Sequence, residues 1–187
     1  MKTGGVRRPC PGRRRLLGLV LLLACAGAAW AQVDEGADEA HVKAAFLYKF
    51  TGYVDWPDSA FDPPGASFVI GVQGSPALLG ELSQLIAGRK IHERPVQVRS
   101  IAAGDSLDGL QVLFVGRSES FRGEASSPVL IVTEADGSMP RGSMINFLVI
   151  DRHVRFVIAL PTVEQAGLRM SSRLLSVAQK VIQAEEH

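Results

Sequence analysis

Cysteine is almost absent from this sequence, and long apolar runs are absent altogether. Its two cysteines, Cys10 and Cys25, both precede residue 32, so the rest of the chain has no disulfide, thiol nucleophile or thiolate metal ligand. Aromatic residues make up 6% of the chain, and its 187 residues include 19 glycines and 10 prolines, which excludes collagen-like and disordered proteins. No apolar run approaches the roughly 20 residues of a membrane span. With 47% apolar residues, the chain is predicted to form one globular domain.

The first 31 residues have the pattern of a secretory signal peptide. A basic start without an acid precedes the apolar stretch 16–29, and Ala29-Trp30-Ala31 has the small-x-small pattern of a cleavage site. We therefore predict a secretory signal peptide over residues 1–31, cleaved after Ala31, and a single domain over 32–187. A basic amphipathic arm is one alternative. Another is a lipid anchor on Cys25, because Leu22-Leu23-Ala24-Cys25 resembles a lipoprotein processing site.

Removal of this segment changes the charge of the protein. It takes away 6 of the 20 basic residues and none of the 19 acidic ones, which leaves 14 against 19 and a formal net charge of −5. A nucleic-acid-binding protein needs a basic stripe to neutralise phosphates, and this sequence has none. We therefore exclude nucleic acid as a partner.

The hydrophobic pattern predicts an α/β protein. Helical spacing runs from Val42 to Val54 and ends at Pro57, and a second helix over 76–86 has Ser75 as its cap and Gly88 as its stop. Strands are predicted at 68–72, 96–101, 111–115, 129–133, 144–150 and 154–160. The last two form a hairpin, and Thr162 and Gln165 fit a capping box. A closing amphipathic helix is marked by Leu174, Leu175, Ala178, Val181 and Ile182. The predicted fold is a three-layer α/β sandwich with a mixed central sheet, a terminal hairpin and a closing helix.

Two of these strands end in glycine and a nearby serine. Carboxyl ends of strands and helix N-termini create crevices whose backbone N–H groups favour anions. A small-ligand site is therefore one reading of these turns, and glycines that merely turn the chain are the other. The residues are Gln73, Gly74, Ser75, Gly116, Arg117 and Ser118.

Catalytic and metal-binding motifs are missing. The histidines His41, His92, His153 and His187 have no partner at ligand spacing, so no metal or other cofactor is predicted. Serines are plentiful but no Gly-x-Ser-x-Gly elbow occurs, so a serine hydrolase remains only a third hypothesis. Nothing in the residues requires an enzyme.

Two polar and aromatic segments are candidate partner-binding surfaces. Trp56 and Phe61 flank a proline-rich loop, where they are either lids of the core or anchors of an interface. Arg169, Ser171, Ser172 and Arg173 surround the start of a predicted helix, where they form either a cap or a polar patch for a partner.

Several segments together resemble the YfiR family of secreted bacterial proteins. The opening segment runs from Val42-Lys43-Ala44-Ala45-Phe46-Leu47-Tyr48-Lys49-Phe50 to Val54-Asp55-Trp56-Pro57. Later ones are Val112-Leu113-Phe114-Val115-Gly116, Gly142-Ser143-Met144-Ile145-Asn146-Phe147, Val154-Arg155-Phe156 and Ala166-Gly167-Leu168 through Ser171-Ser172-Arg173-Leu174-Leu175. The resemblance covers nearly the whole chain after the leader, in the same order.

This resemblance implies a periplasmic regulator that is not an enzyme. It implies repression of a membrane-bound diguanylate cyclase through the periplasmic sensor domain of that cyclase, with effects on cyclic di-GMP and biofilm formation. It also implies an OmpA-like outer-membrane lipoprotein that sequesters the repressor, an α/β sandwich fold and a homodimer. The sequence departs from the family at two points: Ala159 replaces a usual asparagine, and the chain after residue 31 lacks the cysteines that form disulfides in some relatives.

Overall fold

The computed structural model describes residues 35–119, 121 and 127–184 of the chain. The predicted leader, with both cysteines and the cleavage site after Ala31, lies outside these residues. None of the helices in the described ranges is both long enough and apolar enough to cross a membrane.

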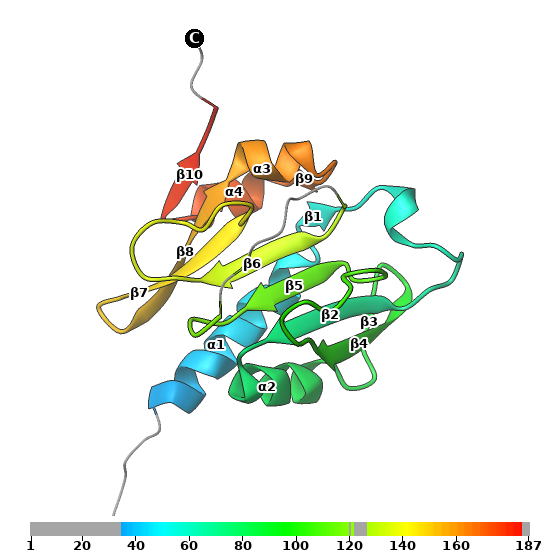
Figure 1. Ribbon diagram of the computed structural model, residues 1–187, viewed down its shortest axis with the longest axis horizontal. Helices are drawn as coiled ribbons and strands as arrows, with labels where there is room; N and C mark the ends of the chain where they lie inside the picture. Colours follow the sequence, from blue (N-terminus) through cyan, green and yellow to red (C-terminus); the bar gives the residue numbers. More distant parts are fainter. Residues whose placement is uncertain (1–34, 120, 122–126, 185–187) are drawn as a thin grey trace, which may run out of the picture. The chain divides into compact units, whose positions relative to one another are not determined.

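A mixed sheet of eight strands forms the centre of the domain (Figure 1). Its order is β10-β8-β7-β6-β5-β2-β4-β3. The strands are β2 (Phe68–Gln73), β3 (Lys90–Ile91), β4 (Arg94–Ser100), β5 (Val112–Val115), β6 (Leu130–Glu134), β7 (Ile145–Ile150), β8 (His153–Ala159) and β10 (Lys180–Ile182). The five central strands β4, β2, β5, β6 and β7 run parallel, and β5 is buried along its whole length. This arrangement confirms the predicted α/β sandwich with a mixed sheet, because parallel strands need cover on both faces.

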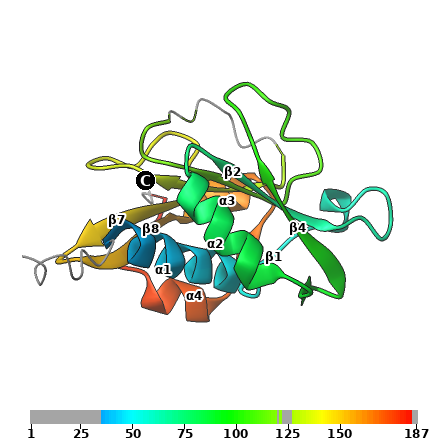
Figure 2. The same ribbon diagram turned by 90° about the horizontal axis from the view of Figure 1, so that it is seen from below.

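Two long helices cover one face of the sheet. They are α1 (Glu35–Phe50) and α2 (Pro76–Ile86), which lie side by side across the strands in Figure 2. Phe46 and Phe50 of α1 pack against Phe147 and Phe156 of the β7–β8 hairpin, with ring centroids 5.0 to 6.1 Å apart. Aromatic rings at these separations bury large apolar areas, so this cluster is a main contact between α1 and the sheet.

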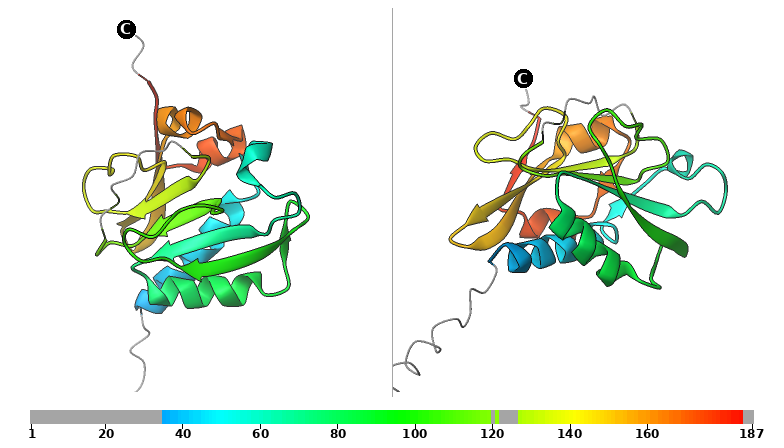
Figure 3. Two further views of the ribbon diagram at one scale, coloured as in Figure 1. Left: turned by 45° about the vertical axis from the view of Figure 1, so that its right-hand side comes forward. Right: turned by 60° about the horizontal axis from the view of Figure 1, so that its bottom comes forward.

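Connecting segments cover part of the opposite face, which Figure 3 (right) presents above the sheet. A Cβ atom on Gly71 in β2 would lie 2.8 Å from the side chain of Ile101 and 3.0 Å from that of Leu110. The connection between β4 and β5 therefore packs directly on the backbone of β2, and glycine at position 71 makes this close approach possible.

Both antiparallel hairpins of the sheet close with two-residue turns. Asp151 and Arg152 between β7 and β8 have φ angles of 50° and 61°, and His92 and Glu93 between β3 and β4 have 48° and 62°. Two successive positive φ angles define a type I′ turn, whose twist matches that of the flanking strands. The predicted terminal hairpin is confirmed, with a turn one residue shorter than expected.

The two predicted end helices differ from the structure. The first ends at Phe50, and Val54 instead belongs to the two-residue strand β1 (Val54–Asp55). Near the C-terminus, the capping-box prediction is wrong, because Thr162 and Gln165 lie inside α3 (Leu160–Gln165).

The predicted closing helix is interrupted. Helix α4 (Ser172–Val177) ends before Ala178, and Lys180–Ile182 form strand β10, which pairs with the edge of β8. The amide of Gln179 donates to the carbonyl of Phe156 at 2.9 Å. The unpaired backbone of β8 offers hydrogen bonds that outweigh the helical pattern, and the β-branched Val181 and Ile182 suit a strand.

Candidate partner-binding surface

A short antiparallel ribbon brings the two predicted partner-binding segments together. Strand β1 pairs with β9 (Arg169–Met170), with Val54 opposite Met170 and Asp55 opposite Arg169. The amide of Ser171 extends this contact by donating to the carbonyl of Tyr53 at 2.9 Å. Segments more than a hundred residues apart in the sequence therefore form one continuous surface.

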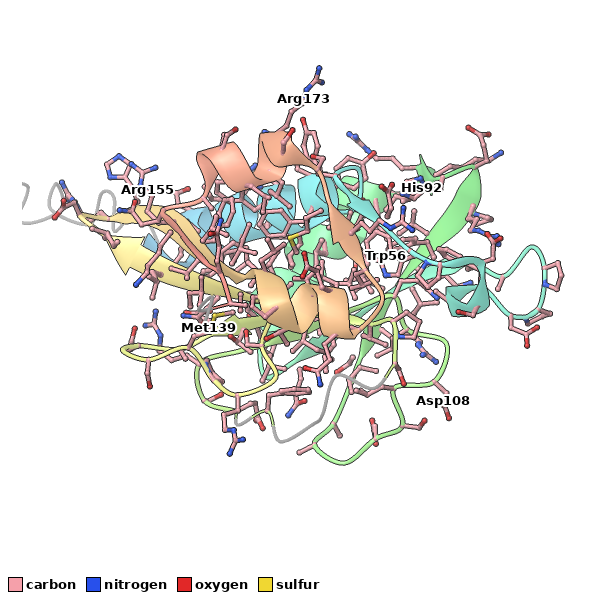
Figure 4. All side chains as sticks on the ribbon, turned by 90° about the horizontal axis from the view of Figure 1, so that it is seen from above. Trp56, His92, Asp108, Met139, Arg155 and Arg173 are labelled. Atoms are coloured by element: carbon pink, nitrogen blue, oxygen red, sulfur yellow. The ribbon has the colours of Figure 1, made fainter. Side chains whose placement is uncertain are left out.

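We call the exposed part of this region the ribbon surface. Its exposed residues are Tyr53, Asp55, Arg169, Ser172 and Arg173. Figure 4 shows the side chain of Arg173 pointing away from the body of the domain. Tyr53, which the sequence reading had assigned to a helix face, is 40% exposed, so the surface combines an aromatic ring with cations and one acid.

Trp56 lies at the edge of the core, half-buried. Its indole ring meets the ring of Phe68 edge-on at 5.1 Å, and its Nε1 donates to the carbonyl of Gln111 at 3.1 Å. The indole N–H is therefore already used within the domain. What Trp56 offers to a partner is the half-exposed part of its ring, next to the ribbon.

Phe61 has a similar position at the other end of the loop. Its ring packs at 6.1 Å from that of Phe68, and the guanidinium of Arg94 lies 4.2 Å from its centroid. Cation–π contact of this kind holds the ring in place. Phe61 therefore serves the packing of the loop, and its role in binding a partner stays a prediction.

Gln111 holds this loop in place, a role that no sequence motif indicates. The side chain is 1% exposed, its Nε2 donates to the carbonyl of Ala60 at 2.6 Å, and its Oε1 accepts from the amide of Val69 at 2.7 Å. Together with its carbonyl bond to Trp56, Gln111 ties the loop to the neighbouring strands β2 and β5. A buried amide with both ends satisfied positions the loop precisely.

Ser171 differs from the exposed members of the ribbon. It is the N-cap residue of α4, yet its hydroxyl makes no capping bond, and its buried Oγ has no hydrogen-bond partner among the described residues. Ser172 is exposed at the first position of the helix. The predicted helix start is confirmed, but the expected side-chain cap is not formed.

The two glycine turns, for which a ligand site is one of two readings, also come together. Strands β2 and β5 are neighbours, and the amide of Gly116 donates to the carbonyl of Gln73 at 2.9 Å. A Cβ atom at Gly116 would lie 2.7 Å from the carbonyl oxygen of Gly74. The absence of a side chain at Gly116 thus allows the ends of the two strands to touch.

Charged side chains already occupy this place. Glu119 lies over Gly74, where an added Cβ would be 2.4 Å from its Cγ, and its Oε2 accepts from Nε2 of Gln73 at 3.2 Å. Arg117 is exposed and pairs with Glu134 at 2.8 Å. An anion bound here would lie beside the carboxylate of Glu119, which opposes binding. Ser75 is half-buried and Ser118 is exposed, and the ligand role of this site stays a prediction.

A pocket of about 430 Å³ lies elsewhere, lined by Leu160, Pro161, Glu164, Gln183 and Ala184. The three histidines in the described ranges bond to other groups: His41 to Glu81, His92 to the carbonyl of Thr51 and His153 to the carbonyl of Asp151. No group of three or more His, Cys, Asp or Glu residues in the described part of the chain could hold a metal ion.

A buried lysine, whose role the sequence did not indicate, joins α1 to the sheet. Lys43 is 4% exposed and contacts two carboxylates, that of Glu39 one turn earlier and that of Glu134 at 2.8 Å. Glu134 also forms an ion pair with Arg117, so one carboxylate connects α1 with the ends of β5 and β6. Buried ion pairs of this kind need both partners, and this one fixes the position of α1.

Comparison with protein families gives a match over most of the described chain. A family model described as YfiR/HmsC-like matches residues 40–179, a range that includes every residue of the ribbon surface and of the glycine turns. No curated protein matches the chain.

Proposed function

The chain belongs to the YfiR/HmsC-like family, and from this membership we propose that it is a periplasmic regulator that represses a membrane-bound diguanylate cyclase. Repression would act through the periplasmic sensor domain of the cyclase and so lower cyclic di-GMP and biofilm formation. The observation that carries this proposal is the match over residues 40–179, which spans almost all of the described domain.

A binding role suits the chemistry of the domain better than catalysis does. The described histidines are engaged with Glu81 and two backbone carbonyls, and the glycine turns hold a carboxylate of the protein itself. The ribbon surface, by contrast, presents a tyrosine and two arginines, and the half-exposed ring of Trp56 lies next to it. Tyrosine, tryptophan and arginine are the residues that most often dominate the energetics of protein–protein interfaces.

Repression of this kind is a shift between two conformations of the cyclase. A regulator that binds only the inactive conformation lowers the active fraction in proportion to its differential affinity. A second partner that competes for the regulator reverses the effect. We assign this second role to an OmpA-like outer-membrane lipoprotein, and we propose that the regulator itself is a homodimer whose single domain spans residues 32–187.

Charge reversal on the ribbon surface tests the proposal. Arg169→Glu and Arg173→Glu change exposed side chains, so the fold should tolerate them. We expect the double variant to lose at least tenfold in affinity for the purified periplasmic domain of a cyclase encoded beside this protein, measured by calorimetry. Trp56→Phe, which keeps most of the ring packing against Phe68, should weaken binding by a smaller factor.

Arg141→Glu is the matched control, because it makes the same charge change at an exposed position of another loop. The Arg141→Glu variant should bind the cyclase domain with the same affinity as the unmodified protein. If the folded Arg169→Glu/Arg173→Glu variant binds as tightly as the unmodified protein, the ribbon surface is not the binding surface. Failure of the unmodified protein to bind the cyclase domain at all would contradict the function.

A further inference from the structure

One long edge of the sheet has no partner strand. β3 pairs only with Arg94 and Pro95 at the start of β4, so the rest of β4 is the outermost strand on this side (Figure 1). The amide of Ile101 donates to the carbonyl of Val72 in β2, so the backbone groups of Ile101 point toward β2. Along a strand, the backbone groups of successive residues point alternately to one side and to the other. The N–H and C=O groups of Val96, Val98 and Ser100 therefore point outward, and no strand in the described ranges pairs with them.

The apolar side of this edge is incompletely covered. Val96 and Val98 lie opposite Phe68 and Ile70 of β2 on the same face of the sheet, the face against which α2 packs. Phe68 and Ile70 are fully buried, but the two valines are only half-buried. An additional strand at this edge would place a side chain next to each valine and complete their burial.

The other side of the edge is basic. Lys90, opposite Pro95, shares a face with Gln97 and Arg99, and all three side chains are exposed. Neither Lys90 nor Arg99 has an ion-pair partner among the described residues. The exposed Glu93 lies in the turn between β3 and β4, three residues from Lys90. The acids that follow β4 are engaged in their own loop: Asp105 accepts from the amide of Ala102, and Asp108 accepts from the hydroxyl of Ser106.

We propose that the outer edge of β4 binds an extended acidic segment of a partner protein by strand addition. The open backbone groups supply the hydrogen bonds. The half-buried valines select apolar side chains at alternate positions of the segment, and Lys90 and Arg99 select acidic ones at the positions between. The partner segment is thus one in which aliphatic and acidic residues alternate, and this inference does not depend on the identity of the partner proposed above.

A synthetic peptide of alternating valine and glutamate with blocked ends is the direct probe. Added to the isotopically labelled, purified protein, it should shift the amide resonances of Val96, Val98 and Ser100 and slow their hydrogen exchange. A peptide of alternating valine and lysine should bind at least tenfold more weakly. A peptide in which prolines replace the valines cannot form a strand and should not bind.

Charge reversal on β4 provides the second measurement. Arg99→Glu should weaken binding of the glutamate peptide by roughly five- to tenfold and strengthen binding of the lysine peptide, because one attraction becomes a repulsion at this exposed position. Arg141→Glu, an equal charge change in an exposed loop, should change neither affinity. Both variants are compared only after their melting curves match that of the unmodified protein.

Three results of the binding experiments would overturn the inference. They are no binding of the glutamate peptide at millimolar concentration, resonance shifts confined to the opposite edge at β10, and equal affinities for the two charged peptides. Concentration-dependent self-association that Arg99→Glu abolishes would also overturn it, since the occupant of the edge would then be a second copy of this chain.

Discussion

Gln111 shows how much one buried polar side chain can organise at the scale of a residue. It follows no motif, yet its amide contacts the Trp56–Phe61 loop and strand β2 at once, through Ala60 and Val69. Trp56 completes the arrangement by donating to the carbonyl of the same residue. The position of Trp56 beside the ribbon surface therefore depends on a residue that itself is hidden from any partner.

Replacing the side chain of Gln111 should destabilise the protein. We expect Gln111→Ala to lower the free energy of unfolding by about 2 to 4 kcal/mol, because it removes a buried side chain and leaves the half-buried amide of Val69 and carbonyl of Ala60 without these partners. Urea denaturation followed by tryptophan fluorescence measures the change. Gln97→Ala, which removes an exposed glutamine with one bond to Ser67, should change it by less than about 0.5 kcal/mol. Similar losses for the two variants would contradict the role given to Gln111.

At the scale of the element, the ends of strands β2 and β5 are set by their glycines. Gly116 lets the two chain ends meet, and Gly74, with a φ angle of 70°, turns the chain into α2. Helix α2 then begins at Pro76 and is stopped by Gly88, whose φ angle is also 70°. Local backbone preferences thus determine where each of these elements starts and stops.

Replacing two different glycines by alanine should change the stability of the protein in opposite directions. Gly116→Ala should destabilise the protein by about 2 to 3 kcal/mol, because its Cβ would clash with the backbone of Gly74. Gly80→Ala should stabilise it by about 0.5 to 1 kcal/mol, because this glycine lies inside α2 with nothing within 4 Å of the added carbon. Thermal unfolding of the two variants beside the parent measures both. Stabilisation by Gly116→Ala would show that the strand ends are not in contact.

At the scale of the whole molecule, the predicted cleavage after Ala31 would separate two parts of different charge. The basic leader and the acidic remainder give the full chain a formal net charge of +1, whereas the chain after residue 31 would carry −5. Such a net charge favours solubility and weakens non-specific contact with nucleic acid. It also makes the basic edge at Lys90 and Arg99 a local exception in an acidic protein.

The mass of the exported protein tests where the chain is processed. We expect the intact mass of a chain that starts at Gln32, recovered from the periplasm, because Ala29-Trp30-Ala31 has the cleavage pattern. A mass that includes a lipid on Cys25, together with recovery from the membrane fraction, would replace this expectation with the anchored form. Cys25→Ser should leave the mass unchanged in the first case and should abolish anchoring in the second.

The sequence by itself determined the strands with continuous apolar runs, the β7–β8 hairpin, helix α2 with its Ser75, Pro76 and Gly88 boundaries, and the family. These features depend on neighbouring residues, whose periodicity and backbone preferences act locally. Only the tertiary structure decided that Val54–Asp55 pairs with Arg169–Met170 and that Lys180–Ile182 is a strand. Strands of two or three residues carry too short a pattern to be recognised, and they form because a distant element leaves backbone groups unpaired. The same holds for Gln111 and Glu119, whose partners are chosen by packing between segments far apart in the chain.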